Sequence, residues 1–218
     1  MTSIRRPDDE ILLRYAAGTL DAGFALLVET HLTMRPRSRE IVACYEAIGG
    51  ALLDEIEPAP SAPDAFEAAL AALDGEPSAR ASEKRPPTRP AFPQGFILPS
   101  TLESREMGQW RWIAPGLRSS PIALRGASES RAFLLEIAPG VRIPRHGHEG
   151  VEMTCVLHGS FSDGTTHFVE GDVAQADAGV EHDIFVDSEI ACICLVAIEG
   201  RTRPRNWFGR LYQRLVDI

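Results

Sequence analysis

Apolar side chains in residues 1–75 recur every three or four positions, a spacing that places them on one face of an α-helix. Aspartate can cap a first helical turn, and proline suits the first helical position because its missing N–H needs no partner there. The pattern predicts four short helices, which begin near Asp8, Asp21, Pro36 and Pro63. The apolar positions of the third helix are Ile41, Cys44, Tyr45 and Ile48. We expect a small all-α domain with a thin core.

From about residue 98 the apolar period changes to two, the period of a β-strand with one buried face. The strand signals are the alternating Phe133, Leu135 and Ile137, the turn at Asp163 and Gly164, and the continuous apolar run IACICLVAI at 190–198. Short strands between glycine-bearing turns indicate a small antiparallel barrel or double sheet. A C-terminal tail follows, with a possible apolar helical stripe formed by Trp207, Phe208, Leu211, Tyr212 and Leu215.

A proline-rich segment separates the two patterns. Eight of the 16 prolines fall within residues 58–93, a density that neither a helix nor a central strand tolerates. We therefore place a linker at residues 76–97, between a helical domain at 1–75 and a β domain with its tail at 98–218. The predicted fold class is α+β in two domains, a small all-α domain followed by an all-β barrel.

Composition narrows the classes of protein. Of the 218 residues 44% are hydrophobic, which is enough for a core, yet no apolar run of about 18 residues exists to span a membrane. Acidic residues among the first twenty positions argue against a secretory signal peptide, and four cysteines are too few for a disulfide framework. We expect a cytoplasmic protein. The net charge of -9 repels phosphates, which disfavours direct DNA binding.

Three histidines and one glutamate form the strongest chemical signal. His146 and His148 are two residues apart, so both imidazoles project from one face of a strand, and Glu152 keeps that parity. His182 comes from a later glycine-bearing block at 171–182. Imidazole and carboxylate ligands suit a divalent transition metal. The sequence therefore predicts one metal site, formed by His146, His148, Glu152 and His182.

Two cysteines offer a second type of chemistry. Cys192 and Cys194 share one face of the predicted strand at 190–198, which permits thiol redox chemistry. Cysteine is also a common small core residue, so packing alone would explain both positions. The remaining histidines of the barrel, His158 and His167, lie outside the metal pattern and are expected on the surface or in turns.

The spacing of the metal residues resembles the motifs of the cupin superfamily. The first motif is matched at Gly140, His146, His148, Glu152 and Gly159, and the second at Gly171, Gly179 and His182. Asp177 and Val186 stand where that superfamily usually has proline and asparagine. These departures bear on cupin enzyme chemistry more than on the fold, which the resemblance implies to be a double-stranded β-helix.

The chain as a whole resembles the ChrR family. The resemblance rests on YAAGTL at 15–20, THL at 30–32, the proline-rich linker, HGHEGVEMTCVLHGSF at 146–161 and ACIC at 191–194. It implies an anti-sigma factor whose helical domain occludes a group IV (extracytoplasmic-function) sigma factor, with release governed by the cupin domain in response to singlet oxygen or peroxides. It also implies zinc in the cupin site, with iron, manganese or nickel as alternatives. For the partner surface we take apolar-stripe positions of the helices, namely Leu12, Phe24, Leu27, Val28 and His31.

One departure from the family concerns a further zinc. Family members hold it in the helical domain on ligands that correspond here to Arg6, His31, Arg35 and Ser38. Only His31 remains a zinc ligand by type, because arginine and serine cannot replace thiolates. We therefore expect no N-terminal zinc site and one zinc per chain.

Two functions of different classes follow from these observations. The first is the anti-sigma regulator; the second is a metal-dependent cupin enzyme, such as a dioxygenase or isomerase, with the helices as a dimerisation arm. An enzyme needs exchangeable coordination positions and a substrate pocket with an acid or base. A regulator needs a partner-binding domain joined to the sensor, and the helical domain favours this interpretation. A homodimer is compatible with both.

Overall fold

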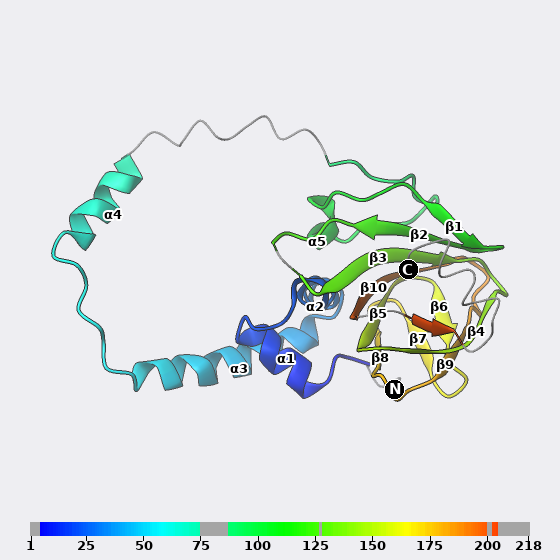
Figure 1. Cartoon of the computed structure of the whole chain (residues 1–218), viewed down its shortest axis with the longest axis horizontal. Helices are drawn as coiled ribbons and strands as arrows, with labels where there is room; N and C mark the ends of the chain where they lie inside the picture. The colour runs from blue at the N-terminus through cyan, green and yellow to red at the C-terminus, as the bar shows by residue number, and fades with distance from the viewer. Residues whose placement is uncertain (1–4, 75–86, 127, 200–201, 205–218) are drawn as a thin grey trace.

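The computed structural model of the chain describes residues 5–74, 87–126, 128–199 and 202–204. Within these residues, helices come first and strands follow (Figure 1). The helices are α1 (Asp9–Ala16), α2 (Ala22–Met34), α3 (Pro36–Asp54), α4 (Ala65–Asp74) and α5 (Ser100–Glu103). The strands are β1 (Arg111–Ala114), β2 (Leu117–Ile122), β3 (Ser130–Ile137), β4 (Arg142–His148), β5 (Glu152–His158), β6 (Ser160–Ser162), β7 (His167–Val169), β8 (Val173–Ala176), β9 (His182–Phe185), β10 (Cys192–Glu199) and β11 (Thr202–Pro204).

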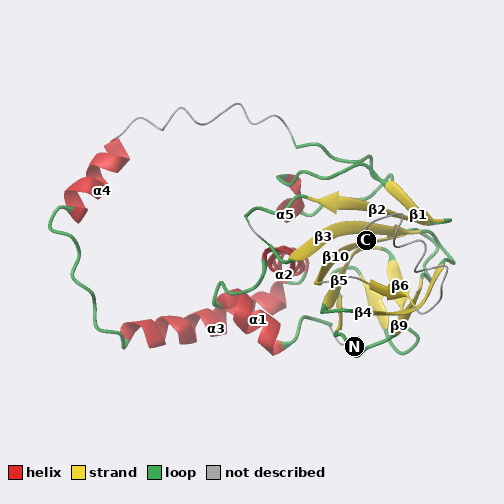
Figure 2. Cartoon of the chain, in the orientation of Figure 1, coloured by secondary structure: helices red, strands yellow, loops and turns green. Residues whose placement is uncertain are grey.

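The strands form two antiparallel sheets, as the period-two pattern predicts. One sheet has the order β1-β2-β3-β10-β5-β8 and the other the order β11-β4-β9-β6-β7. Figure 2 shows the two sheets curving around a common interior, with helices on one side. The apolar run predicted as a doubly buried strand is β10, which lies between β3 and β5. The hairpin predicted at Asp163 and Gly164 joins β6 to β7. The predicted α+β fold class is confirmed.

The helix starts follow the predicted capping residues. The Asp8 carboxylate accepts the Ile11 N–H at 2.8 Å and begins α1, and the Asp21 carboxylate accepts the Gly23 N–H at 3.3 Å and begins α2. Pro36 occupies the first turn of α3. These contacts satisfy amide groups that no intrahelical carbonyl can reach.

The third helix is only half buried, which corrects the apolar face predicted for it. Of the four predicted positions, Ile41 and Tyr45 pack against the core beside the buried Val42. Cys44 and Ile48 are exposed. The N-terminal half of α3 packs on α1 and α2, and its C-terminal half projects away from them (Figure 1). The apolar spacing marked a helix face correctly but did not show how far the neighbouring helices extend.

Two hydrophobic clusters lie on the two faces of the six-stranded sheet. Along β5 and β10 successive side chains alternate between them, as the pleat of a strand requires. The outward-pointing residues pack against α1, α2 and α5 and include Met153, Cys155, Leu157, Ile193, Leu195 and Ala197. The inward-pointing residues fill the barrel and include Val156, Cys192, Cys194 and Val196. The helices and the barrel therefore share one core across this sheet.

The second half of the predicted linker lies along the barrel. Phe92, Phe96 and Leu98 are packed against the cluster that the helices share with the sheet. The Trp110 indole N–H donates to the Ala91 carbonyl at 2.8 Å, and the Met107 N–H donates to Thr88 at 2.8 Å. Residues 88–98 thus have no regular secondary structure but are fixed by contacts. The apolar stripe predicted for the tail lies outside the described residues.

No helix among the described residues is both long enough and apolar enough to cross a membrane.

Candidate metal centre

The four predicted metal ligands converge inside one end of the barrel. His146 and His148 come from β4 and His182 from β9, two neighbouring strands of the five-stranded sheet. Glu152 begins β5 in the opposite sheet. One ligand atom from each residue lies within 4.8 Å of the others, the separation expected of atoms that share one metal ion. His146, His148 and Glu152 are buried, and His182 is partly exposed.

The local chain explains why these side chains meet. His146 lies opposite His182 in the β4–β9 pair, after an irregularity between Ile143 and His146. The turn that follows β4 brings Glu152 back beside His148 and passes close to Glu199 at the end of β10. A Cβ on Gly150 would lie 2.8 Å from the Glu199 Cβ, so this turn needs glycine.

The distances suit a small cation. His148 Nε2 lies 3.0 Å from His182 Nε2, and His148 Nδ1 lies 3.3 Å from a Glu152 oxygen. His148 Nδ1 is buried and has no hydrogen-bond partner among the residues that the structure describes. A buried ring nitrogen without a partner costs free energy in the protein alone, and coordination to a metal would satisfy it. The residues present therefore fit a metal.

The protonation states also suit metal binding. Burial lowers the pKa of His148 to about 3, with the imidazoles of His146 and His182 adding to the shift, and burial lowers the pKa of His182 to about 4. The imidazoles are therefore neutral near pH 7, as metal ligands must be. Burial raises the pKa of Glu152 to about 7, and the Thr154 hydroxyl partly offsets this shift. A bound cation would favour the ionised carboxylate.

The two predicted redox cysteines lie deeper in the same interior. Cys192 and Cys194 are buried, and their Sγ atoms are 3.5 Å apart. The contact with Cys192, followed by burial, raises the pKa of Cys194 well above its ordinary value, so the thiol is protonated. Cys155 points to the opposite face of the sheet, and burial raises its pKa to about 12.

The five residues predicted as partner contacts are buried inside the chain. Leu12, Phe24, Leu27, Val28 and His31 are each at most 3% exposed. The four apolar ones belong to the cluster that the helices share with the outer face of the barrel sheet. In this arrangement α2, which carries all of them except Leu12, packs on the barrel of its own chain.

The positions that correspond to the family's N-terminal zinc ligands make other contacts. Arg6 forms an ion pair with Asp9 at 2.9 Å. His31 lies between Ser38 and the Gly171 carbonyl, and Arg35 forms an ion pair with Asp172 at 3.1 Å. Two of the four positions, His31 and Arg35, thus connect helices to the barrel, and Ser38 joins α3 to His31 of α2.

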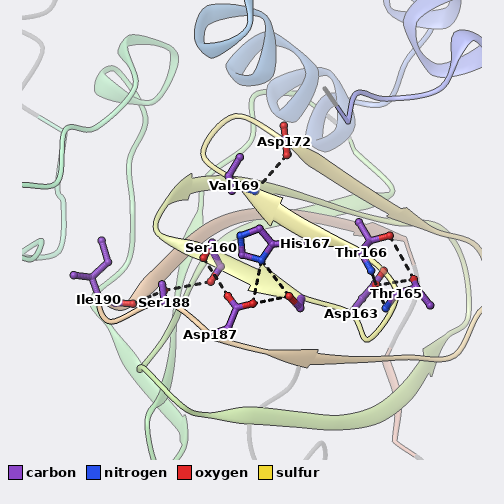
Figure 3. A network of polar contacts seen from close by, with 11 residues as sticks. Ser160, Asp163, Thr165, Thr166, His167, Val169, Asp172, Asp187, Ser188 and Ile190 are labelled. Carbon is purple, nitrogen blue, oxygen red and sulfur yellow. Dashed lines mark hydrogen bonds and ion pairs between the residues drawn. The ribbon is translucent and has the colours of Figure 1, made fainter. Parts of the chain in front are cut away.

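The two barrel histidines outside the metal cluster pair with carboxylates. His158 Nδ1 lies 3.0 Å from Glu170, at the end of β5. His167 Nδ1 lies 3.0 Å from Asp187, which also accepts hydrogen bonds from Ser160 and Ser162 (Figure 3). Ser162 Oγ also lies 3.1 Å from His167 Nδ1, the same ring nitrogen that faces Asp187, whereas a serine–histidine–aspartate relay uses opposite ring nitrogens. This group of side chains links β6, β7 and the loop after β9.

These features agree with one known family. Residues 102–199 match the family described as ChrR Cupin-like domain. Over 218 residues the chain is 33% identical to the anti-sigma-E factor ChrR of Cereibacter sphaeroides, and the match covers 100% of both proteins. The chain belongs to the ChrR family. It is also similar to a chain in the crystal structure of Rhodobacter sphaeroides SigE in complex with the anti-sigma ChrR, with 32% identity and a TM-score of 0.71. That match covers 89% of this chain and 98% of the other.

Sequence reasoning missed the polar contacts that hold the helices of this ChrR-family chain on its barrel. Asp172 and Arg35 form one of them, and the Asp21 carboxylate, predicted only as a helix cap, also accepts hydrogen bonds from Ser128 and Ser130 near the start of β3. A possible signal was the adjacency of Gly171 and Asp172, which follows the pattern of a tight turn with a carboxylate beside it.

Proposed function

We propose that this chain is an anti-sigma factor that sequesters a group IV sigma factor and releases it in response to singlet oxygen or peroxides. The observation that carries the proposal is its similarity over the full length to ChrR, a family to which it belongs. The similar chain in the solved structure is bound to SigE. The barrel, with its candidate metal centre, is the proposed sensor.

The exposed apolar side chains of α3 and α4 are the part of the proposed partner surface that is available in this arrangement. They are Ile48, Leu52, Leu53, Phe66, Leu70 and Leu73, and Ile56 just after α3 is exposed as well. Exposed apolar residues on helix segments that do not pack into the chain's own core are typical of a protein interface. The five buried residues proposed from the sequence would reach a sigma factor only if α1 and α2 left the barrel. Binding through α3 and α4 requires no such change.

Sigma-factor binding is tested by co-expression of the full chain with group IV sigma factors, followed by co-purification and a measured Kd. Leu53→Asp should weaken binding at least tenfold without changing thermal stability, because Leu53 is 66% exposed. Ile97→Asp is the matched control, since Ile97 is 86% exposed and lies outside both helices. A well-folded chain with no affinity for any group IV sigma factor would contradict the proposal and favour a cupin enzyme.

The proposed resident metal is zinc, held by His146, His148, Glu152 and His182. When bound, it would be coordinated by residues of both sheets and so connect the sheets at this end of the barrel. It would also bind the free ring nitrogens of the neutral imidazoles. The two thiols give the same interior an oxidisable pair. Hydrogen peroxide would oxidise Cys192 and Cys194 to a disulfide: the two thiols lose two protons and two electrons, and the peroxide takes them up as its O–O bond breaks and two waters form. A disulfide needs an S–S distance of about 2.05 Å, so the two sulfur atoms, now 3.5 Å apart, would have to approach each other.

The sensing part is tested separately from binding. His148→Ala in the full chain should still bind the sigma factor but should not release it on exposure to singlet oxygen or hydrogen peroxide. Cys192→Ser tests whether the peroxide response uses the thiol pair. Release by both oxidants at the native rate from both variants would show that sensing lies outside the barrel interior.

A further inference from the structure

A buried polar cluster joins the α2–α3 junction to the turn before β8. His31 Nδ1 lies 2.7 Å from the Gly171 carbonyl, and His31 Nε2 lies 2.8 Å from the Ser38 hydroxyl. A carbonyl only accepts, so Nδ1 carries the proton and donates to Gly171, while Nε2 accepts from Ser38. Burial lowers the pKa of His31, in agreement with this neutral tautomer. Both ring nitrogens are therefore satisfied across the interface.

Arg35 adds a charged contact beside this histidine. Its guanidinium forms an ion pair with Asp172 at 3.1 Å and also donates to the Glu170 carbonyl. Asp172 is almost completely buried, and Figure 3 shows it at the edge of the barrel nearest the helices. A Cβ on Gly171 would lie 2.7 Å from Arg35 Nε, and its φ of +83° also favours glycine. Glycine at position 171 therefore leaves the space that the Arg35 side chain occupies beside this turn.

The same turn is bonded to the strand that carries a candidate metal ligand. The Gly171 N–H donates to the Val156 carbonyl at 2.7 Å, and the Val156 N–H donates to the Asp172 carbonyl at 3.0 Å. Val156 lies four residues after Glu152 on β5 and opposite Cys194 on β10. A short series of hydrogen bonds thus connects Arg35 and His31 to β5. This strand begins with Glu152 and pairs with β10, which carries the two thiols.

We propose that His31, Arg35 and Ser38 form a clamp that couples the docking of the helices to the state of β5. Occupancy of the metal centre would then alter how firmly α2 and α3 are held on the barrel. The inference rests on the metal centre of the proposed function, but not on the identity of the partner. The clamp would transmit a change in the barrel because it ties the docked helices to β5, a strand whose first residue, Glu152, is a candidate metal ligand.

The coupling is tested on the full chain by hydrogen exchange with and without added Zn²⁺, with zinc content measured in the same samples. Zinc should slow exchange of the amides at 31–38 at least fivefold in the native protein, and this response should be lost in Arg35→Ala. Arg118→Ala is the matched control, because Arg118 has the same 28% exposure and also pairs with a carboxylate, that of Glu136. It should keep the response.

Zinc binding without a change at residues 31–38, or an unchanged response in Arg35→Ala, would overturn the coupling. If neither the native protein nor any variant binds zinc, the proposed metal centre is wrong, and the proposed coupling fails with it. Sigma-factor binding is tested by its own experiment.

A double-mutant cycle of Arg35→Ala and Asp172→Asn tests the clamp by denaturation. Each change should lower the folding equilibrium constant about tenfold, with no further loss in the double variant. Strict additivity would exclude a clamp, and Ser38→Ala provides a milder variant.

Discussion

At the scale of single residues, the candidate metal centre depends on one histidine more than on the others. His148 is the most buried of the three, and its ring contacts both His182 and Glu152. Its unpartnered Nδ1 is the clearest sign that the cluster is incomplete as protein alone. Removing this side chain leaves three ligands on two sheets, which is too few for a tight structural site.

We predict that His148→Ala lowers the zinc content from about one per chain to near zero. The same change should lower the thermal stability, because a bound metal contributes directly to folding free energy. Elemental analysis and a melting curve measure both effects. His158→Ala, at the far end of β5, should retain the metal. Two zinc ions per native chain would contradict the predicted loss of the N-terminal site.

A second residue with a large expected effect on stability is Asp21. It caps α2 and joins this helix to the start of β3 through hydrogen bonds. Although burial raises its pKa, hydrogen bonds from Ser130, Ser128 and two backbone amides hold the pKa well below its usual range. A carboxylate whose pKa is lowered by folding stabilises the protein fully above its unfolded pKa of about 3.9. This contribution is lost progressively as the pH falls from that value through the lower pKa of the folded state.

We therefore predict that Asp21→Ala costs about 2 kcal/mol at pH 7 and less at pH 3. Asp21→Asn keeps a capping oxygen but removes the charge, so it should reduce the difference between the two pH values. Chemical denaturation at pH 7 and pH 3 measures these free energies. An equal cost for Asp21→Ala at both pH values would show that the ionised carboxylate is not the stabilising group.

At the scale of elements, α2 is the helix that joins the two parts of the chain. It contacts β3, β5 and β10 as well as α1, α3 and α5. Apolar residues surround most of it, which suits a helix covered by helices on one side and a sheet on the other. In contrast, α3 leaves this core halfway along its length, and the described side chains of α4 are all exposed.

We predict that Leu27→Ala lowers the free energy of unfolding by about 2 to 5 kcal/mol, since Leu27 is fully buried between α2 and the sheet. Leu13→Ala on α1 should change it by less than about 0.5 kcal/mol, because Leu13 is 48% exposed. Urea denaturation of the two variants gives the comparison. Similar small effects would mean that α2 is not docked on the barrel in solution.

At the scale of the whole molecule, the helical part and the barrel are not independent. The outer face of β5 and β10 is covered by α2, and the segment 88–98 covers more of the same cluster. Separating the two parts would expose a continuous apolar surface on each. A surface of that kind seeks another partner, which includes a second copy.

We predict that a fragment of residues 1–75 is poorly folded alone or self-associates. The full chain, in which the barrel follows the helices in the same polypeptide, should be folded. Sedimentation velocity and circular dichroism distinguish these states. The control is the full chain at the same concentration. A stable, monomeric fragment would show that the helices do not need the barrel for their core.

The sequence by itself determined the features that depend on local periodicity and spacing. Capping residues set the starts of α1 and α2, alternation set the strands, and the parity of His146, His148 and Glu152 placed them together with His182. These features are predictable because a strand or helix fixes the direction of each side chain relative to its neighbours in the chain.

Only the tertiary structure decided which faces meet. An apolar stripe with Leu27 and Val28 has the same pattern whether it covers its own barrel or a partner, so the sequence could not tell the two apart. The clamp of Arg35 and Asp172 joins residues 137 positions apart, and neither position carries a local signal of the other. Hydrophobic burial is non-directional and roughly proportional to area, and therefore the final pairing of surfaces is set by the shape of the whole molecule.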